Sequence, residues 1–313
     1  MNVENETFVK EFLLVGHISL LHYPKLLFML LLIIYIMSQV GNSLIITIVK
    51  LDSRLHTPMY FFLCNLSLVE IIYTSVTFPT ILGVALERTK WISVPGCLAQ
   101  IYFLHFIGVV ECLLLTIMAY DRYAAICRPL HYSIVMNRTV CMSLAGICWL
   151  SGFLNSMAVI IMTSRLPFCG PKTIMNFFCD IPQLLKLACA DTTVNEALLT
   201  LAGVLIGLLP CLFIVITYIW VVSAIVKIPS TQGRWKAFST CASHVIVVSI
   251  FFGTLLFMYM RPTPLDSSDQ DQLVSLMYTV LTPMLNPLIY SLRNNEVKEA
   301  LKKVLTSKYH HNI

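Results

Sequence analysis

The stretch LLTIMAYDRYAAICRPLHY, Leu114–Tyr132, begins as an apolar run, contains the acid and base Asp121 and Arg122, and ends just after Pro129. The acid and the base are adjacent in the chain, so they form one compact ionic spot at the end of a membrane-length apolar segment. A charge at the boundary between bilayer and water suits a contact that changes with conformation. We therefore interpret this spot as a switch, and the rest of the chain as the means of moving its surroundings.

Composition indicates a membrane protein. Only 12% of the 313 residues are charged and 58% are hydrophobic, which is outside the range of soluble domains. The apolar segments are spread evenly along the chain, which favours one bundle over two domains. The first twenty-odd residues lack the basic start and apolar core of a cleavable signal peptide, so we expect the first span to act as its own targeting signal.

Seven apolar segments of about 20 residues or more are each long enough to cross a hydrocarbon core of ~30 Å. We place them near 24–49, 58–85, 96–127, 140–163, 196–226, 236–260 and 270–292. The sequence thus predicts an all-α membrane protein, a seven-transmembrane helix bundle over 24–292 that follows an amino-terminal segment at 1–23. The tail at 293–313 has a short amphipathic pattern, which predicts an eighth helix lying on the membrane surface.

The distribution of charge predicts the orientation. Thirteen of the 21 lysines and arginines fall in the loops and tail on one side of the predicted bundle. By the positive-inside rule that side is cytoplasmic, so we expect a plasma-membrane protein with an extracellular amino terminus and a cytoplasmic carboxyl terminus. The glycosylation sequon at Asn5 supports this orientation. The net charge of +5 therefore reflects topology, and we expect no nucleic-acid partner. Sequon matches at Asn65 and Asn137 are expected to be chance.

A long extracellular loop, 164–195, carries three cysteines, and a fourth opens the third span on the same side. They are Cys169, Cys179, Cys189 and Cys97. Four cysteines in an oxidising compartment allow three pairings, and spacing does not choose among them. We expect this loop to fold over the bundle as a lid, and the other seven cysteines to be small packing residues.

Four strings narrow the class of protein: Leu55–Leu63 (LHTPMYFFL), Met118–Tyr132 (MAYDRYAAICRPLHY), Lys236–His244 (KAFSTCASH) and Pro283–Asn294 (PMLNPLIYSLRN). With them, the chain resembles the rhodopsin-like G-protein-coupled receptors and, within these, the odorant (olfactory) receptors. Ser239 and the FFCD string ending at Asp180 resemble the class II, or tetrapod-type, members. The resemblance implies a receptor for a small volatile odorant that activates a heterotrimeric G protein of the stimulatory, olfactory class and raises cAMP. It implies no enzymatic activity and no required cofactor.

The resemblance also assigns roles to residues. It implies the disulfides Cys97–Cys179 and Cys169–Cys189. It implies a set of residues for switching and G-protein coupling: Asp121, Arg122, Tyr123, Tyr218, His244, Asn286, Pro287 and Tyr290. In this set Arg122 would leave Asp121 when the sixth span swings outward, and would then contact the G protein.

Polar residues within four spans form a second expected cluster: Asn42, Glu70, Glu111 and Asn286. Acids inside a membrane are costly, and two that converge repel unless a cation or a shared proton lies between them. The resemblance implies a sodium ion here in the inactive state, although the family usually has Asp where this chain has Glu70. A cation, a shared proton and a neutral hydrogen-bonded pair all remain open.

The ligand site is expected in the outer part of the bundle, because Leu104 lies roughly 25 Å from Asp121 along a helix. Its predicted residues are Leu104, His105, Gly108, Val109, Asn155, Ser156, Ala202, Ile206, Phe252, Leu255, Tyr259, Leu276 and Thr279. This set is mainly apolar with sparse polar groups and no acid, which favours a small, weakly polar ligand and disfavours amines. His105 is either such a polar group or a packing residue. Cys241 and His244, three residues apart, are interpreted as structural and not as metal ligands.

Other functions fit the sequence less well. A secondary transporter would show internal repeats and interrupted helices, and the chain shows no repeat. An enzyme would need a catalytic motif such as a Ser/His/Asp order or a glycine-rich phosphate loop, which we do not find. A rhodopsin-like receptor for a non-odorant lipid, metabolite or peptide is the closer alternative. The short first and third extracellular loops argue against a peptide.

Overall fold

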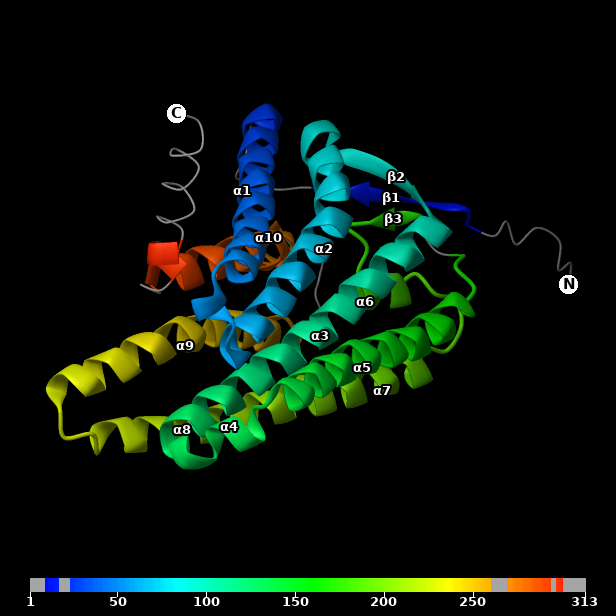
Figure 1. Ribbon diagram of the computed structural model, residues 1–313. Helices are drawn as coiled ribbons and strands as arrows, with labels where there is room; N and C mark the ends of the chain where they lie inside the picture. Colours follow the sequence, from blue (N-terminus) through cyan, green and yellow to red (C-terminus); the bar gives the residue numbers. More distant parts are fainter. Residues whose placement is uncertain (1–8, 17–22, 170, 260–268, 294–296, 301–313) are drawn as a thin grey trace, which may run out of the picture.

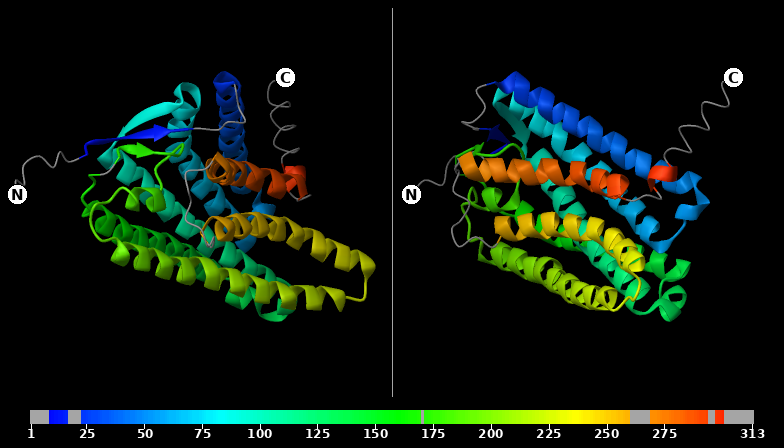
Figure 2. Two further views of the ribbon diagram at one scale, coloured as in Figure 1. Left: turned by 180° about the vertical axis from the view of Figure 1, so that it is seen from behind. Right: turned by 90° about the vertical axis from the view of Figure 1, so that its left-hand side faces the viewer.

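The computed structural model describes residues 9–16, 23–169, 171–259, 269–293 and 297–300. Long helices lie side by side in one bundle, and a small β-sheet lies across one end of it (Figure 1 and Figure 2). The long helical elements are α1 (Pro24–Leu51), α2 (Pro58–Glu87), α3 (Val94–Cys127), α5 (Arg138–Ser164), the continuous rod of α7 (Thr193–Ala202), η3 (Gly203–Leu208) and α8 (Leu209–Val226), α9 (Thr231–Tyr259) and α10 (Asp269–Arg293).

These helices lie where the sequence has its seven apolar segments. Within the described residues, six of them are long and apolar enough to cross a membrane, and α10 is the helix outside that group. α10 is less apolar because one of its faces carries buried polar side chains: Gln272, Ser275, Thr279, Thr282 and Asn286. It packs against α1, α2 and α9, so this face is turned toward protein and not toward lipid. Where the bilayer begins and ends along the helices stays a prediction.

Local sequence explains where several helices begin. α1, α2 and α3 each carry a proline in the first turn, where a missing N–H costs nothing. Asn137 caps α5, because its side-chain oxygen accepts a hydrogen bond of 3.0 Å from the Val140 N–H. Asn65 accepts a hydrogen bond of 3.1 Å from the indole of Trp149 and thereby links α2 to α5. Each of these asparagines therefore makes a structural hydrogen bond.

The sheet is an addition that the sequence did not predict. β1 (Glu11–Val15) pairs antiparallel with β2 (Thr89–Ser93) and parallel with β3 (Thr173–Ile174). Strand alternation places Phe12 and Leu14 on the buried face, and both are 0% exposed. The chain leaves β1 at Gly16, where an added Cβ would lie 2.8 Å from Phe177 and from Val84. The amino-terminal strand is thus packed into the lid.

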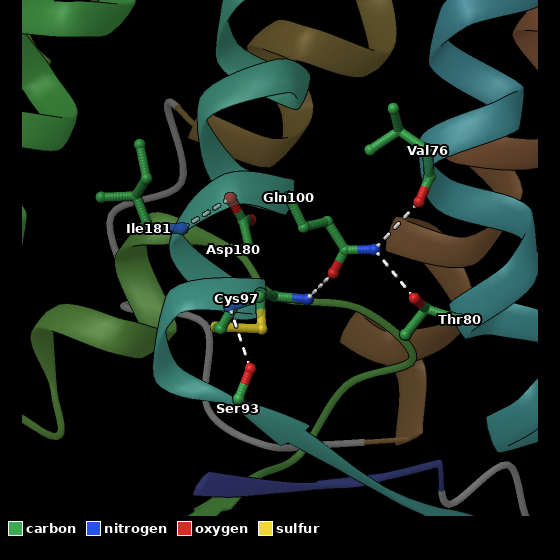
Figure 3. The surroundings of a disulfide bond; sticks show 9 residues. Val76, Thr80, Ser93, Cys97, Gln100, Asp180 and Ile181 are labelled. Carbon is green, nitrogen blue, oxygen red and sulfur yellow. Dashed lines mark hydrogen bonds between the residues drawn. A yellow bond between two sulfur atoms is a disulfide. The ribbon is translucent and has the colours of Figure 1, made fainter. Parts of the chain in front are cut away.

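Two disulfides complete the lid. Cys97 is bonded to Cys179 and Cys169 to Cys189, with Cα–Cα separations of 5.5 Å and 5.9 Å. Both pairings that the resemblance implied are therefore confirmed. Beside the first bond, the Gln100 side chain accepts a hydrogen bond of 2.9 Å from the Cys179 N–H and donates one of 3.2 Å to Thr80 (Figure 3). The loop is thus fixed to both α3 and α2.

The core has two main layers. The outer core cluster packs below the lid around Phe12, Phe78 and Phe177, and the inner core cluster fills the rest of the bundle around Phe62 and Phe251. At the end away from the sheet, the short η2 (Pro129–His131) and α4 (Tyr132–Val135) follow α3. Of the predicted eighth helix, only residues 297–300 lie within the described residues, and they are helical.

Candidate functional site

In the ionic spot at the end of α3, both carboxylate oxygens of Asp121 have a partner. Asp121 is 0% exposed, and the Arg122 guanidinium forms an ion pair with it, including an Nε–H bond of 3.1 Å to Oδ2. The Tyr132 hydroxyl donates a second hydrogen bond of 2.7 Å to the other carboxylate oxygen. The buried charge of Asp121 is therefore both paired and hydrogen-bonded, as a buried charge requires.

Tyr132 is a partner that the sequence did not single out. Burial raises the pKa of its phenol, and so does the charge of Asp121, which keeps the hydroxyl protonated and able to donate. Tyr132 belongs to the motif string that ends the opening stretch, but spacing alone does not show that α4 turns it back toward Asp121. Only the fold brings the two together.

On its other side the ionic spot faces α9. The Arg122 guanidinium lies close enough to Cys241 and His244 to interact electrostatically with both. His244 is 1% exposed and shares a hydrogen bond of 2.7 Å between its Nδ1 and the Tyr218 hydroxyl, with the two rings stacked. Arg122 thus lies between Asp121 at the end of α3 and the α9 residues Cys241 and His244. The Tyr218–His244 hydrogen bond joins α9 to α8 beside it.

One more of the predicted switch residues, Tyr123, packs at this end. Tyr123 contacts the small cluster of Val221, Ile225 and Cys241, and the Arg128 guanidinium lies 5.9 Å from its ring centroid. The side chain of Tyr290 lies outside the described residues. The predicted set is therefore gathered around Arg122 on one side, while Asn286 and Pro287 lie at a second place in α10.

At that second place two acids meet. Glu70 of α2 and Glu111 of α3 are 1% and 4% exposed and interact electrostatically. The Asn286 side-chain amide donates a hydrogen bond to Glu70 Oε1. In the described part of the chain, Glu70 Oε2 and Glu111 Oε1 make no hydrogen bond of good geometry. Two carboxyl oxygens are therefore left available for a cation or a shared proton, and this donor set of oxygens fits a hard cation.

Within the described residues, Asn42 makes its hydrogen bonds with groups other than the two acids. Its amide donates a bond of 3.0 Å to the Ser38 carbonyl and lies 3.4 Å from the Pro283 carbonyl. That second carbonyl has no helical donor four residues on, because Pro287 lacks an N–H. Ser38 Oγ donates to it at 3.0 Å, so Asn42 and Ser38 fasten α1 to the proline-containing part of α10.

The predicted ligand residues divide between the two core layers. His105 Nε2 and Asn155 Oδ1 lie 2.7 Å apart and join α3 to α5. Leu104 and Leu276 pack with the outer core cluster. The remaining apolar members near the bundle centre pack with the inner core cluster: Ile206, Phe252 and Leu255.

The remaining predicted ligand residues differ in burial and in hydrogen bonding. Ser156 is 1% exposed, and its hydroxyl has no hydrogen-bond partner in the described part of the chain. Thr279 is also buried and lies beside Tyr73. Nothing within 4 Å would meet a Cβ added at Gly108. Val109 and Ala202 are buried, and the side chain of Tyr259 lies outside the described residues. Ala202 directly precedes η3 and Ile206 lies within it. This π-helical segment is an irregularity often found at functional sites.

Comparison with known proteins agrees with this architecture. A family model described as olfactory receptor matches residues 31–308. Human olfactory receptor 2G6 is 47% identical over 305 residues, which cover 97% of this chain and 96% of that protein. Human olfactory receptor 10C1 is 49% identical over 301 residues, covering 96% of each.

The fold itself is similar to a solved structure. The crystal structure of squid rhodopsin superposes with a TM-score of 0.71 at 18% sequence identity, covering 88% of this chain and 78% of that one. This likeness concerns the seven-helix fold, in which α10 takes the place of the seventh span. The family match and the identities above, over nearly the whole chain, carry the assignment further. The chain therefore belongs to the olfactory receptor family, and it is an odorant receptor of the rhodopsin-like, G-protein-coupled class, a multi-pass plasma-membrane protein and not an enzyme.

Proposed function

We propose that this receptor binds a small, mostly apolar volatile ligand in the outer half of its bundle. Binding would release Arg122 toward a stimulatory, olfactory-type G protein and raise cAMP. The observation that carries the proposal is the enclosure of Arg122 between Asp121 and α9. A contact that is closed in one arrangement and available in another is what a ligand-biased two-state bundle needs.

The coupling surface is supported by exposed apolar side chains at the same end. Leu130 and Ile134, in η2 and α4, are 88% and 69% exposed. Large apolar side chains exposed in this way are typical of a protein–protein contact. They adjoin Tyr132, which bonds Asp121, so a partner docked there would reach the ionic spot.

The proposed orientation has the lid outside and this end inside. It is supported by the two disulfides of the lid, which need an oxidising compartment, and by the basic excess at the other end. The ligand chemistry is supported by the mainly apolar residues around the His105–Asn155 contact, which offers one or two hydrogen bonds to a ligand.

The experiment begins with a panel of chemically diverse volatiles applied to cells that express the receptor and a cAMP reporter. With an active volatile in hand, Arg122→Ala should abolish the cAMP response while surface expression persists. Arg138→Ala, which removes an exposed arginine at the start of α5, is the control and should respond like the wild type. An undiminished response in Arg122→Ala at equal surface expression would contradict the mechanism.

We also propose that the Glu70–Glu111 pair holds a monovalent cation, sodium, in the closed form. The support is the pair of carboxyl oxygens without good hydrogen bonds, flanked by the Asn286 amide. A monovalent cation there would balance one of the two like charges that burial brings together and so weaken their repulsion, and it would join α2, α3 and α10.

A further inference from the structure

A crevice of about 150 Å³ lies between α1 and α10. Its walls are apolar and include Met37, Gly41, Leu44, Ile48, Pro287 and Val297. Met37 and Leu44 are 46% and 36% exposed, so the crevice opens on the side of the bundle that faces lipid. It contains none of the residues predicted to bind the odorant, and it is therefore a separate feature.

The shape of the crevice follows from backbone chemistry. Gly41 faces Pro287, and an added Cβ would lie 3.1 Å from the proline Cβ. The missing side chain at Gly41 lets the two helices approach closely here without a tight contact. The bond of 3.0 Å from Ser38 to the Pro283 carbonyl holds α1 and α10 together one turn farther along α1 toward its start. The crevice is therefore a consequence of how α1 and α10 pack against each other.

The length of the crevice matches one leaflet of a bilayer. From Met37 to Ile48, α1 advances about 16 Å, close to half of a hydrocarbon core of ~30 Å. Val297, which follows α10, closes the end nearest the carboxyl terminus. An extended acyl chain parallel to α1 would cover this length.

Basic side chains surround the closed end. Arg54 of η1 (Ser53–Leu55) forms an ion pair of 2.7 Å with Asp52, and its Nη1 lies 3.9 Å from Glu299 Oε2 in the helical residues 297–300. Lys50, at the end of α1, and Lys298 are both exposed, and from residue 293 to residue 308 the sequence has five basic and two acidic residues. A basic rim beside an apolar crevice complements the anionic lipids of a cytoplasmic leaflet.

We propose that the α1–α10 crevice binds one acyl chain of an anionic phospholipid, whose head group lies against Arg54 and Lys298. The assignment to the cytoplasmic leaflet rests on the proposed orientation, but the binding itself does not. An epitope tag at the carboxyl terminus that is stained on intact cells would overturn the orientation and leave binding in detergent unchanged.

The test uses the full-length receptor purified in detergent, mixed with equal concentrations of phosphatidylserine, phosphatidylcholine and cholesterol, and read by native mass spectrometry. We expect one retained phosphatidylserine, preferred over phosphatidylcholine by about fivefold or more, because each basic residue near the head group contributes at about that level. Arg54→Gln and Lys298→Gln should each reduce this preference. Lys227→Gln, which removes an exposed cytoplasmic charge at the end of α8, should leave it unchanged.

Two variants fill the crevice from its exposed side. Leu44→Trp and Met37→Trp should each lower phosphatidylserine retention about tenfold. Ile36→Trp adds the same ring on the same helix at a side chain that is 52% exposed and outside the crevice, and should retain the lipid. If one of these two variants is not monodisperse after purification, lipid retention by the other one tests the proposal.

Four results would overturn the proposal. They are equal retention of phosphatidylserine and phosphatidylcholine by the wild type, undiminished retention by a folded crevice variant, retention of cholesterol in place of the phospholipid, and a receptor dimer that the crevice variants disrupt. The last two would identify a sterol or a second copy of the chain as the occupant.

Discussion

At the scale of single residues, Asp121 shows how a buried charge is kept in place. Its carboxylate has two different partners, the adjacent Arg122 and the Tyr132 hydroxyl, one on each oxygen. Removing one partner weakens the closed arrangement without leaving the charge alone. The phenol is the more informative partner to remove, because it does not take part in the proposed G-protein contact of Arg122.

Tyr132→Phe should raise the cAMP level in the absence of ligand. Loss of a hydrogen bond to a charged group costs about 1–2 kcal/mol, which would shift the closed-to-open ratio about tenfold. Basal cAMP normalised to surface expression measures the effect. Tyr120→Phe is the control. It removes a hydroxyl from α3, about two turns before the end of that helix, and should leave basal cAMP unchanged. A basal level in Tyr132→Phe equal to that of the wild type would show that this bond does not stabilise the closed form.

The burial of Asp180 in the lid should make the stability of the receptor depend on pH. Burial raises the pKa of its carboxyl to about 6, partly offset by the hydrogen bond that it accepts from the Ile181 N–H (Figure 3). The folded state therefore binds a proton more tightly than the unfolded state, so this residue's contribution to the free energy of unfolding falls as pH rises from about 4 to about 6. The change should be on the order of 3 kcal/mol.

Asp180→Asn should remove this part of the pH dependence while keeping an oxygen that accepts from Ile181. Thermal unfolding of the purified receptor, followed between pH 4 and pH 7, measures it. Parallel pH curves for the wild type and Asp180→Asn would mean that the lid leaves this carboxyl with its ordinary pKa.

At the scale of elements, β1 is stabilised by what it packs against. Its partners in the sheet come from the loop after α2 and from the long loop after α5. Its buried side chain Phe12 forms an edge-to-face contact with Phe168, at 5.6 Å between ring centroids. The strand thus links the amino terminus to both parts of the lid.

Phe12→Ala should lower the stability of the receptor by about 3 kcal/mol, because the phenyl ring is fully buried and the cavity left behind would not close completely. Leu13→Ala, in the same strand but on the partly exposed face, should cost less than about 1 kcal/mol. The melting temperatures of the two purified variants test this difference. Equal losses would mean that the strand does not pack on the outer core cluster in solution.

At the scale of the whole molecule, three helices meet at the acid pair. Glu70 comes from α2, Glu111 from α3 and Asn286 from α10, so whatever neutralises the acids also holds these helices in one arrangement. A ligand that binds only the closed form stabilises it by mass action.

If sodium occupies this place, the melting temperature of the purified receptor should be higher in sodium chloride than in choline chloride at equal ionic strength, by about 3 °C. Glu70→Gln and Glu111→Gln should each abolish the difference. A wild-type melting temperature that is the same in both salts would exclude the cation and favour a shared proton or a neutral pair.

The sequence by itself determined the helical bundle, the family and the identity of the ionic spot. Hydropathy over a span is a sum of local transfer free energies, so the apolar segments predicted helices without knowledge of their neighbours. Asp121 and Arg122 are adjacent in the chain, so the sequence placed both charges at one spot, and the structure shows them paired. The two disulfides were among the pairings that the cysteines allowed, and the resemblance selected them correctly.

Only the tertiary structure decided which distant side chains meet. Asn42 bonds to the Ser38 and Pro283 carbonyls, and Pro287 leaves the Pro283 carbonyl without a helical donor. Tyr132 turns back to Asp121 because η2 and α4 reverse the chain. β1 forms because it pairs with β2 and β3, which lie far along the chain. The five residues of β1 do not by themselves predict this pairing. The α1–α10 crevice likewise exists only where Gly41 meets Pro287, since the space between two helices depends on both surfaces at once.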